Sequence, residues 1–124
     1  GLTGANDLRD VHRMSDGGDE RASLALEVYA HRVRKYLGAY AAVMGGLDAV
    51  TFTAGVGEND VAMRSLIMQG LGFLGIEVDP GRNQSGGEAA RTISAAGSRV
   101  AVMVVPTDEE LAIAQQTLAT VNAD

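Results

Sequence analysis

Residues 48–64 read DAVTFTAGVGENDVAMR, and this stretch determines how the rest of the chain is interpreted. The apolar run at 49–54 is typical of a strand, the glycines at 55 and 57 bracket a polar turn, and a helical pattern begins near Asp60. Two glycines let a backbone turn tightly and approach a ligand closely, and the free N–H groups of a following helix favour an anion. Residues 55–59 therefore form either a simple turn or a phosphate-binding loop at a strand-to-helix junction.

The composition restricts the class of protein. The chain has 124 residues, of which 46% are hydrophobic and 21% charged, as expected for one globular domain or a substantial piece of one. It contains no bilayer-length apolar run and no signal-peptide pattern, so we expect a cytoplasmic protein with no membrane partner. With no cysteine and two distant histidines, a bound metal would be a hard cation with oxygen ligands. A net charge of −6 with dispersed basic residues argues against nucleic-acid binding.

The first twenty residues lack a sustained period and carry four glycines, which predicts a loop with turns. Asp7, Leu8, Arg9 and Asp10 place three charges around one apolar residue. This cluster is either a solvated turn or a hydrogen-bonding loop in which Arg9 presents a planar array of donors.

Residues 19–44 show the spacing of an amphipathic helix that ends at the glycine pair 45–46. Its apolar stripe contains all three tyrosines, and we expect these rings to pack in a core or an interface rather than to stack on a nucleotide. The stripe consists of Ala22, Leu26, Tyr29, Val33, Tyr36, Leu37, Tyr40 and Met44.

The second half of the chain alternates short strands with helices. After the strand at 49–53, we expect a helix capped by Asn59 or Asp60 that runs to Gln69, a short edge strand at 76–78 and a turn at 80–81. Residues 91–94 and 99–105 predict a hairpin whose second arm is an interior strand, and residues 111–121 predict a last helix. A helix–strand–helix order favours a parallel sheet covered by helices, with ligands at the carboxyl ends of its strands.

The last helix opens on residues 106–110, PTDEE. Thr107 and Glu110 have the spacing of a capping box, which gives Glu110 a structural role. Glu109 either complements the helix dipole from the first turn or binds Mg²⁺ through oxygen.

Three clusters, GLTGANDLRDV at 1–11, FTAGVGEND at 52–60 and VVPTDEELAIA at 104–114, occur in an order that resembles the C-terminal part of the acetate kinase family, which includes propionate kinases. The resemblance implies an α/β, ribonuclease-H-like segment with a sheet flanked by helices, as in the acetate and sugar kinase, Hsc70 and actin superfamily. It also implies that residues 1–124 are part of the C-terminal nucleotide-binding domain of a longer kinase, with no second domain in this chain.

The resemblance further implies a reversible, Mg²⁺-dependent transfer of a phosphoryl group between ATP and acetate or another short-chain carboxylate. It assigns the adenosine side of the nucleotide site to Asp7, Leu8 and Arg9. It assigns the nucleotide-binding loop to Gly55, Val56, Gly57, Glu58 and Asn59, and the Mg²⁺ ligand to Glu109. Within the loop, Glu58 is better suited to orienting the backbone, or the water of a bound cation, than to touching a phosphate.

The family's catalytic residues are expected upstream, so we expect none in this segment and no kinase activity from the segment alone. Neither His12 nor His31 stands in the context of the family's catalytic histidine. Homodimers are expected, with the tyrosine-bearing helix partly at the interface. The alternative is a non-catalytic nucleotide-binding or interaction module of the same fold. A Rossmann-type site fits poorly, because GVGEND lacks the third glycine of its fingerprint.

Overall fold

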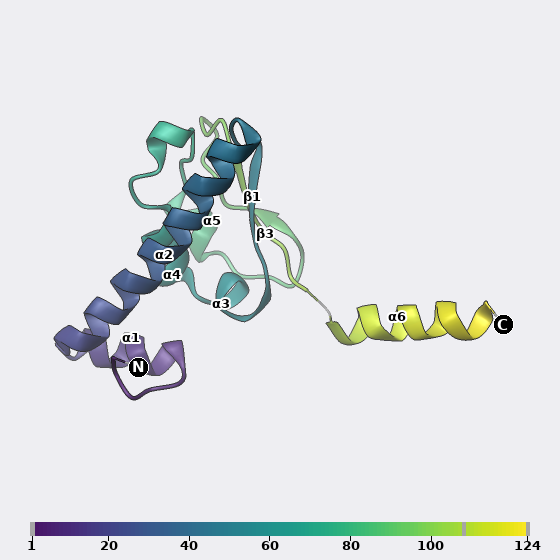
Figure 1. The fold of residues 1–124 in the computed structure, drawn as a ribbon, viewed down its shortest axis with the longest axis horizontal. Helices are drawn as coiled ribbons and strands as arrows, with labels where there is room; N and C mark the ends of the chain where they lie inside the picture. The colour runs from purple at the N-terminus through teal and green to yellow at the C-terminus, as the bar shows by residue number, and fades with distance from the viewer. Residues whose placement is uncertain (1, 108, 124) are drawn as a thin grey trace.

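The chain forms a three-stranded sheet with helices packed around it, and a last helix that projects away from this body (Figure 1). The structure is a computed structural model that describes residues 2–107 and 109–123, with the backbone alone for residues 109–113. The elements are α1 (Leu8–Asp16), α2 (Glu20–Met44), β1 (Ala49–Phe52), α3 (Ala54–Asn59), α4 (Val61–Met68), a 3₁₀ turn (Gly72–Leu74), α5 (Pro80–Gln84), β2 (Arg91–Thr92), β3 (Ala101–Val104) and α6 (Glu109–Asn122).

The sheet has the strand order β1-β3-β2. β1 and β3 are parallel, with Ala49 opposite Ala101 and Phe52 opposite Val104, whereas β2 is antiparallel to β3. The predicted interior strand is confirmed, since β3 lies in the middle and its Val102 and Val104 side chains are fully buried. Because β1 and β3 are parallel, the segments that follow them, residues 53–60 and 105–107, emerge at one edge of the sheet.

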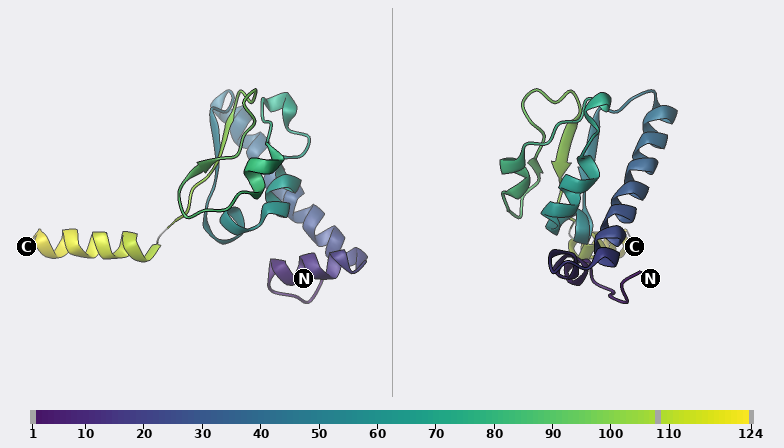
Figure 2. Two further views of the ribbon diagram at one scale, coloured as in Figure 1. Left: turned by 180° about the vertical axis from the view of Figure 1, so that it is seen from behind. Right: turned by 90° about the vertical axis from the view of Figure 1, so that its left-hand side faces the viewer.

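The long helix α2 confirms the prediction for residues 19–44. The Asp19 side chain caps its first turn by accepting from the backbone N–H groups of Arg21 and Ala22, and Gly45, at φ 75°, ends it in the left-handed region. Alanines form much of its buried face: Ala22 and Ala30 are inaccessible to solvent. The small side chains let α2 pack closely against α1 and α4. In Figure 2, α1 lies beside the N-terminal end of α2.

The tyrosines of α2 do not join the core of this chain. Tyr29, Tyr36 and Tyr40 are 39%, 59% and 59% exposed, and the rings of Tyr36 and Tyr40 stack on each other with centroids 6.5 Å apart. The prediction that these rings pack in the core is therefore wrong. Their place in an interface stays a prediction.

The predicted N-terminal loop is wrong, because residues Leu8–Asp16 form α1. Asp7 caps this helix by accepting a hydrogen bond of 2.9 Å from the backbone N–H of Arg9. Val11, one turn beyond Leu8, is buried in the core. The sequence signals for this helix are one cap and one buried side chain. Such a short pattern shows no helical period of apolar residues, and the neighbouring glycines favour a loop.

Two predicted turns are also short helices. Residues 55–59, predicted to be a loop, belong to α3, and the predicted turn at 80–81 opens α5, where Pro80 follows the capping side chain of Asp79. The predicted edge strand at 76–78 is reduced to a single bridge between Val78 and Ser94. Within the described residues, no helix has both the length and the apolar character needed to cross a bilayer.

Candidate functional site

The short helix α3 stands between two open cavities at the carboxyl edge of the sheet. The cavity on the α1 side has a volume of about 870 Å³ and the one on the β3 side about 840 Å³. Gly55 and Asn59 line both of them. The α1-side cavity is completed by Asn6, Asp7, Leu8, Arg9, His12, Arg13, Val56, Asp60 and Val61, and the β3-side cavity by Ala54, Glu58, Gly87, Glu88, Arg91, Val104, Pro106 and Thr107.

Glu58 ties α3 to the end of β3. Its Oε1 accepts hydrogen bonds from the backbone N–H of Thr107 at 2.7 Å, the Thr107 hydroxyl at 3.1 Å and the backbone N–H of Ala54 at 2.9 Å. These donors, above all the Thr107 N–H, lower the pKa of the Glu58 carboxyl below its usual value. The contacts agree with the predicted role of Glu58 in orienting the loop.

The backbone of Ala54 is strained where the chain leaves β1. Its φ is 58°, in the left-handed region that residues with a Cβ seldom adopt, at a cost of about 1–2 kcal/mol. The hydrogen bond from its N–H to Glu58 helps to hold this conformation. Together, the strain and the hydrogen bond fix the direction in which α3 leaves the sheet.

A buried arginine holds α3 from beneath. Arg64 on α4 is 1% exposed, and its Nη1 donates to the carbonyls of Gly57 and Glu58, each at 2.9 Å. Its Nε and Nη2 donate to the Oδ1 and backbone carbonyl of Asn83 at 2.7 and 2.8 Å. Burial, and secondarily the charge of Arg91, lowers the pKa of the Arg64 guanidinium. Since the carbonyl end of a helix carries partial negative charge, α3 and this cation complement each other.

Gly55 and Gly57 differ in whether the surrounding structure requires glycine. A Cβ at Gly57 would lie 3.3 Å from the carbonyl carbon and 3.4 Å from the Cβ of Phe52, so this residue must be small for α3 to pack on β1. A Cβ at Gly55 would meet no atom within 4 Å, and Gly55 does not have a positive φ. The described part of the chain therefore provides no internal reason for glycine at position 55.

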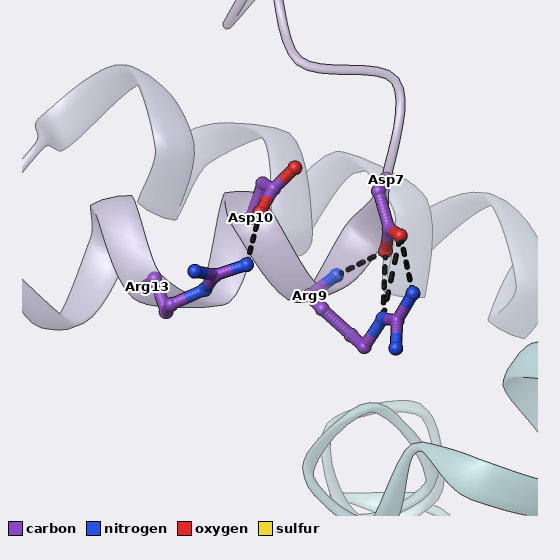
Figure 3. Close-up of polar contacts among 4 residues, drawn as sticks. All are labelled: Asp7, Arg9, Asp10 and Arg13. Carbon is purple, nitrogen blue, oxygen red and sulfur yellow. Dashed lines mark hydrogen bonds and ion pairs between the residues drawn. The ribbon is translucent and has the colours of Figure 1, made fainter.

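Asp7 and Arg9 form a closed pair at the start of α1 (Figure 3). The Arg9 Nη2 donates to the Asp7 Oδ2 at 2.8 Å, while Arg13 turns back to Asp10 one turn further on. The Arg9 side chain lowers the pKa of the Asp7 carboxyl to about 2. Both members of the Asp7–Arg9 pair are well exposed, so the guanidinium plane remains accessible from the cavity.

The structure brings most of the predicted site residues together. The α1-side cavity joins Asp7, Leu8 and Arg9 to Gly55, Val56 and Asn59, although the two groups lie far apart in the sequence. Glu58 faces the other cavity, and Gly57 packs against Phe52. α6 begins at Glu109, but the side chain of Glu109 and the predicted Thr107–Glu110 capping box lie outside the described part of the chain.

Sequence reasoning missed Arg64, Asn83 and the role of Thr107 as a donor to Glu58. A signal for Arg64 exists, because it is the one charged residue in the mostly apolar helix VAMRSLIM. Among the described side chains, no three potential metal ligands converge. A magnesium nucleotide does not require such a cluster, because Mg²⁺ keeps several waters and takes one or two carboxylates together with phosphate oxygens.

The fold and site define an α/β segment of the ribonuclease-H-like class, with its polar residues gathered at the carboxyl edge of the sheet. Residues 1–115 match the Acetokinase family, and the chain belongs to that family.

Relatives and solved structures agree with this family assignment. The chain is 57% identical to the acetate kinase of Leifsonia xyli over 99% of the chain, and 56% identical to that of Streptomyces coelicolor over 98%. The crystal structure of Porphyromonas gingivalis acetate kinase superposes with a TM-score of 0.87 at 42% identity, over 97% of the chain, and that of a Francisella tularensis propionate kinase with 0.81 at 38%, over 92%. The chain spans about 30% of the length of these proteins.

Proposed function

We propose that this chain provides the nucleotide-binding part of the C-terminal domain of an acetate kinase, which transfers a phosphoryl group reversibly between ATP and acetate or another short-chain carboxylate. The relatives carry the name acetate kinase, and this chain shares more than half of its residues with them. Asp7, Leu8 and Arg9 frame the adenosine end of the nucleotide, and residues 55–59 position its phosphates. The carboxylate-binding and phosphoryl-stabilising groups lie outside this chain, so the segment alone is inactive.

The observation that supports this proposal most strongly is the open space at Gly55. Among the described residues, neither packing nor backbone conformation requires glycine there, yet Gly55 lines both cavities. A missing side chain at such a position allows a ligand to approach the backbone closely. Glu58, Arg64 and the strained Ala54 hold this backbone in place before the ligand arrives, which is how phosphoryl-transfer enzymes obtain much of their effect.

Magnesium enters the proposal through Glu109, at the start of α6 directly after the carboxyl edge of the sheet. One carboxylate there, with phosphate oxygens and water, suits the coordination that Mg²⁺ prefers. The bound ion would neutralise phosphate charge. Because ATP is the co-substrate, we place the protein in the cytoplasm.

The proposal also includes a homodimer in which the exposed face of α2 lies at the interface. That face carries the stacked Tyr36 and Tyr40 and, at its end, the exposed Val43 and Met44. Aromatic residues and Met are enriched at protein interfaces.

Substitution of Gly55 tests the nucleotide site. In the complete gene product that contains this chain, Gly55→Val is expected to raise the KM for ATP about tenfold or more, with little change in the KM for acetate, because the side chain occupies ligand space. Thermal stability should change little, since a Cβ at position 55 meets no atom of the described residues within 4 Å. Gly57→Val is the matched control: it clashes with Phe52 and should lower stability as well.

An unchanged KM for ATP in Gly55→Val would refute the proposed site. The alternative, a non-catalytic nucleotide-binding or interaction module, predicts Mg·ADP binding without acetate-dependent turnover. Measuring acetyl phosphate formation and Mg·ADP binding on the same preparation separates the two functions.

A further inference from the structure

His12 and Asp60 both line the α1-side cavity, and their side chains form a bridge between α1 and the start of α4. The His12 Nε2 lies 2.8 Å from the Asp60 Oδ2, and the two side chains are only 22% and 14% exposed. The residues are 48 positions apart in the sequence. Among the hydrogen bonds and ion pairs of the described residues, this is the only one that joins α1 to the segment from α3 to α4.

The partner carboxylate is itself held in place. The Asp60 Oδ1 accepts from the backbone N–H of Met63 at 2.8 Å and so caps α4, which leaves Oδ2 directed to His12. The cap orients one carboxylate oxygen, and the bridge uses the other. His12 is therefore anchored to the same junction from which α3 and α4 diverge.

The bridge joins the two walls of the cavity. Its α1 wall contains Asp7, Leu8 and Arg9, and its opposite wall contains Gly55, Val56 and Asn59. α1 also packs on α2, and its Val11 reaches the core, so the bridge adds a directed polar contact to this packing in fixing the distance from Arg9 to Gly55. A change of about 1 Å in such a spacing is enough to weaken a positioned ligand substantially.

We propose that His12 is a positioning residue for the nucleotide, acting through Asp60 to hold the two walls of this cavity at the spacing that the adenosine end requires. The inference rests on the proposed nucleotide-binding function. His12 does not act as an acid or base in it. In the bridge, the His12 Nε2–H donates to the Asp60 carboxylate.

Four variants of the complete gene product test the proposal. His12→Leu removes the bridge and keeps an apolar side chain, whereas His12→Gln retains an N–H donor at a similar reach. Asp60→Ser retains the cap of α4, since serine is a good N-cap, but is too short to reach His12. His31→Leu is the matched control, because His31 is exposed on α2 and lines neither cavity.

Calorimetric titration with Mg·ADP is the readout, together with KM for ATP and kcat. We expect His12→Leu and Asp60→Ser each to raise the Kd for Mg·ADP about five- to tenfold, the loss of a charge-assisted hydrogen bond, with kcat at saturating ATP changed less than about twofold. The double variant should bind no more weakly than either single one, because both remove the same bridge. His12→Gln and His31→Leu should bind within about twofold of the wild type.

Binding by both His12→Leu and Asp60→Ser within twofold of the wild type would overturn the positioning role. Should His12→Leu fail to fold, Asp60→Ser decides alone, because it keeps the cap. Different results would show that the proposed nucleotide-binding function itself is wrong. In that case the wild type does not bind Mg·ADP, or Gly55→Val binds it as tightly as the wild type does, and this inference falls with it.

Discussion

At the residue scale, the ionisation of Glu58 controls the link between the ends of the two parallel strands. Three donors converge on one carboxylate oxygen, and they lower its pKa below the usual 4.5. A carboxyl whose pKa is lowered in the folded state stabilises the fold above its unfolded pKa. That stabilisation is lost as the pH falls below 4.5 and passes through the lowered pKa.

Acid unfolding of Glu58→Gln checks this role. The wild type should have a higher Tm than the variant at pH 7, and the difference should shrink as the pH falls below 4.5, because Glu58 of the wild type then loses its charge and becomes neutral like the Gln of the variant. Glu27→Gln, an exposed change on α2, should follow the wild-type profile. A constant difference between Glu58→Gln and the wild type across this range would contradict the account.

At the scale of elements, α3 depends on Arg64 for its position. We predict that Arg64→Met lowers the free energy of unfolding by about 3 kcal/mol, because it leaves the carbonyls of Gly57, Glu58 and Asn83 without their donor. Chemical denaturation of the complete gene product measures the change. Arg34→Met is the control. It removes contacts to the carbonyls of Leu66 and Gln69 from a more exposed side chain, and should cost less than about 1 kcal/mol.

The sequence predicted the elements whose signals are local. α2, α4 and β3 have a sustained period or an unbroken apolar run, and Asp19, Asp60 and Gly45 mark helix ends in positions that caps favour. α3 was missed because AGVGEN contains two glycines and no period, so its helical form depends on Glu58 and on Arg64 beneath it.

The tertiary contacts of the site could not be predicted from local sequence patterns. Arg64 reaches Asn83, and His12 reaches Asp60, only after the elements have packed, and no spacing along the chain encodes those distances. The predicted site residues were named from a resemblance. The structure gathers most of them around α3, but their roles in nucleotide binding remain proposals.

At the scale of the whole molecule, the exposed face of α2 is the proposed dimer interface. Replacing Tyr36 and Tyr40 together by arginine should weaken self-association at least tenfold, because it places charge where aromatic surface is buried. Sedimentation equilibrium measures the mass. Phe73→Arg, which changes a still more exposed ring away from α2, should remain dimeric. A double variant with the wild-type mass would exclude this face as the interface.

The central claim is that α1 and α3 line a nucleotide site from its two sides. Hydrogen exchange of the complete gene product, with and without saturating Mg·ADP, tests it most directly, because amides covered by a ligand exchange more slowly. The account predicts that Mg·ADP slows exchange in peptides covering residues 6–13 and 54–61, while the exposed middle of α2 is unchanged. Binding of Mg·ADP that leaves both of these peptides unprotected would contradict it.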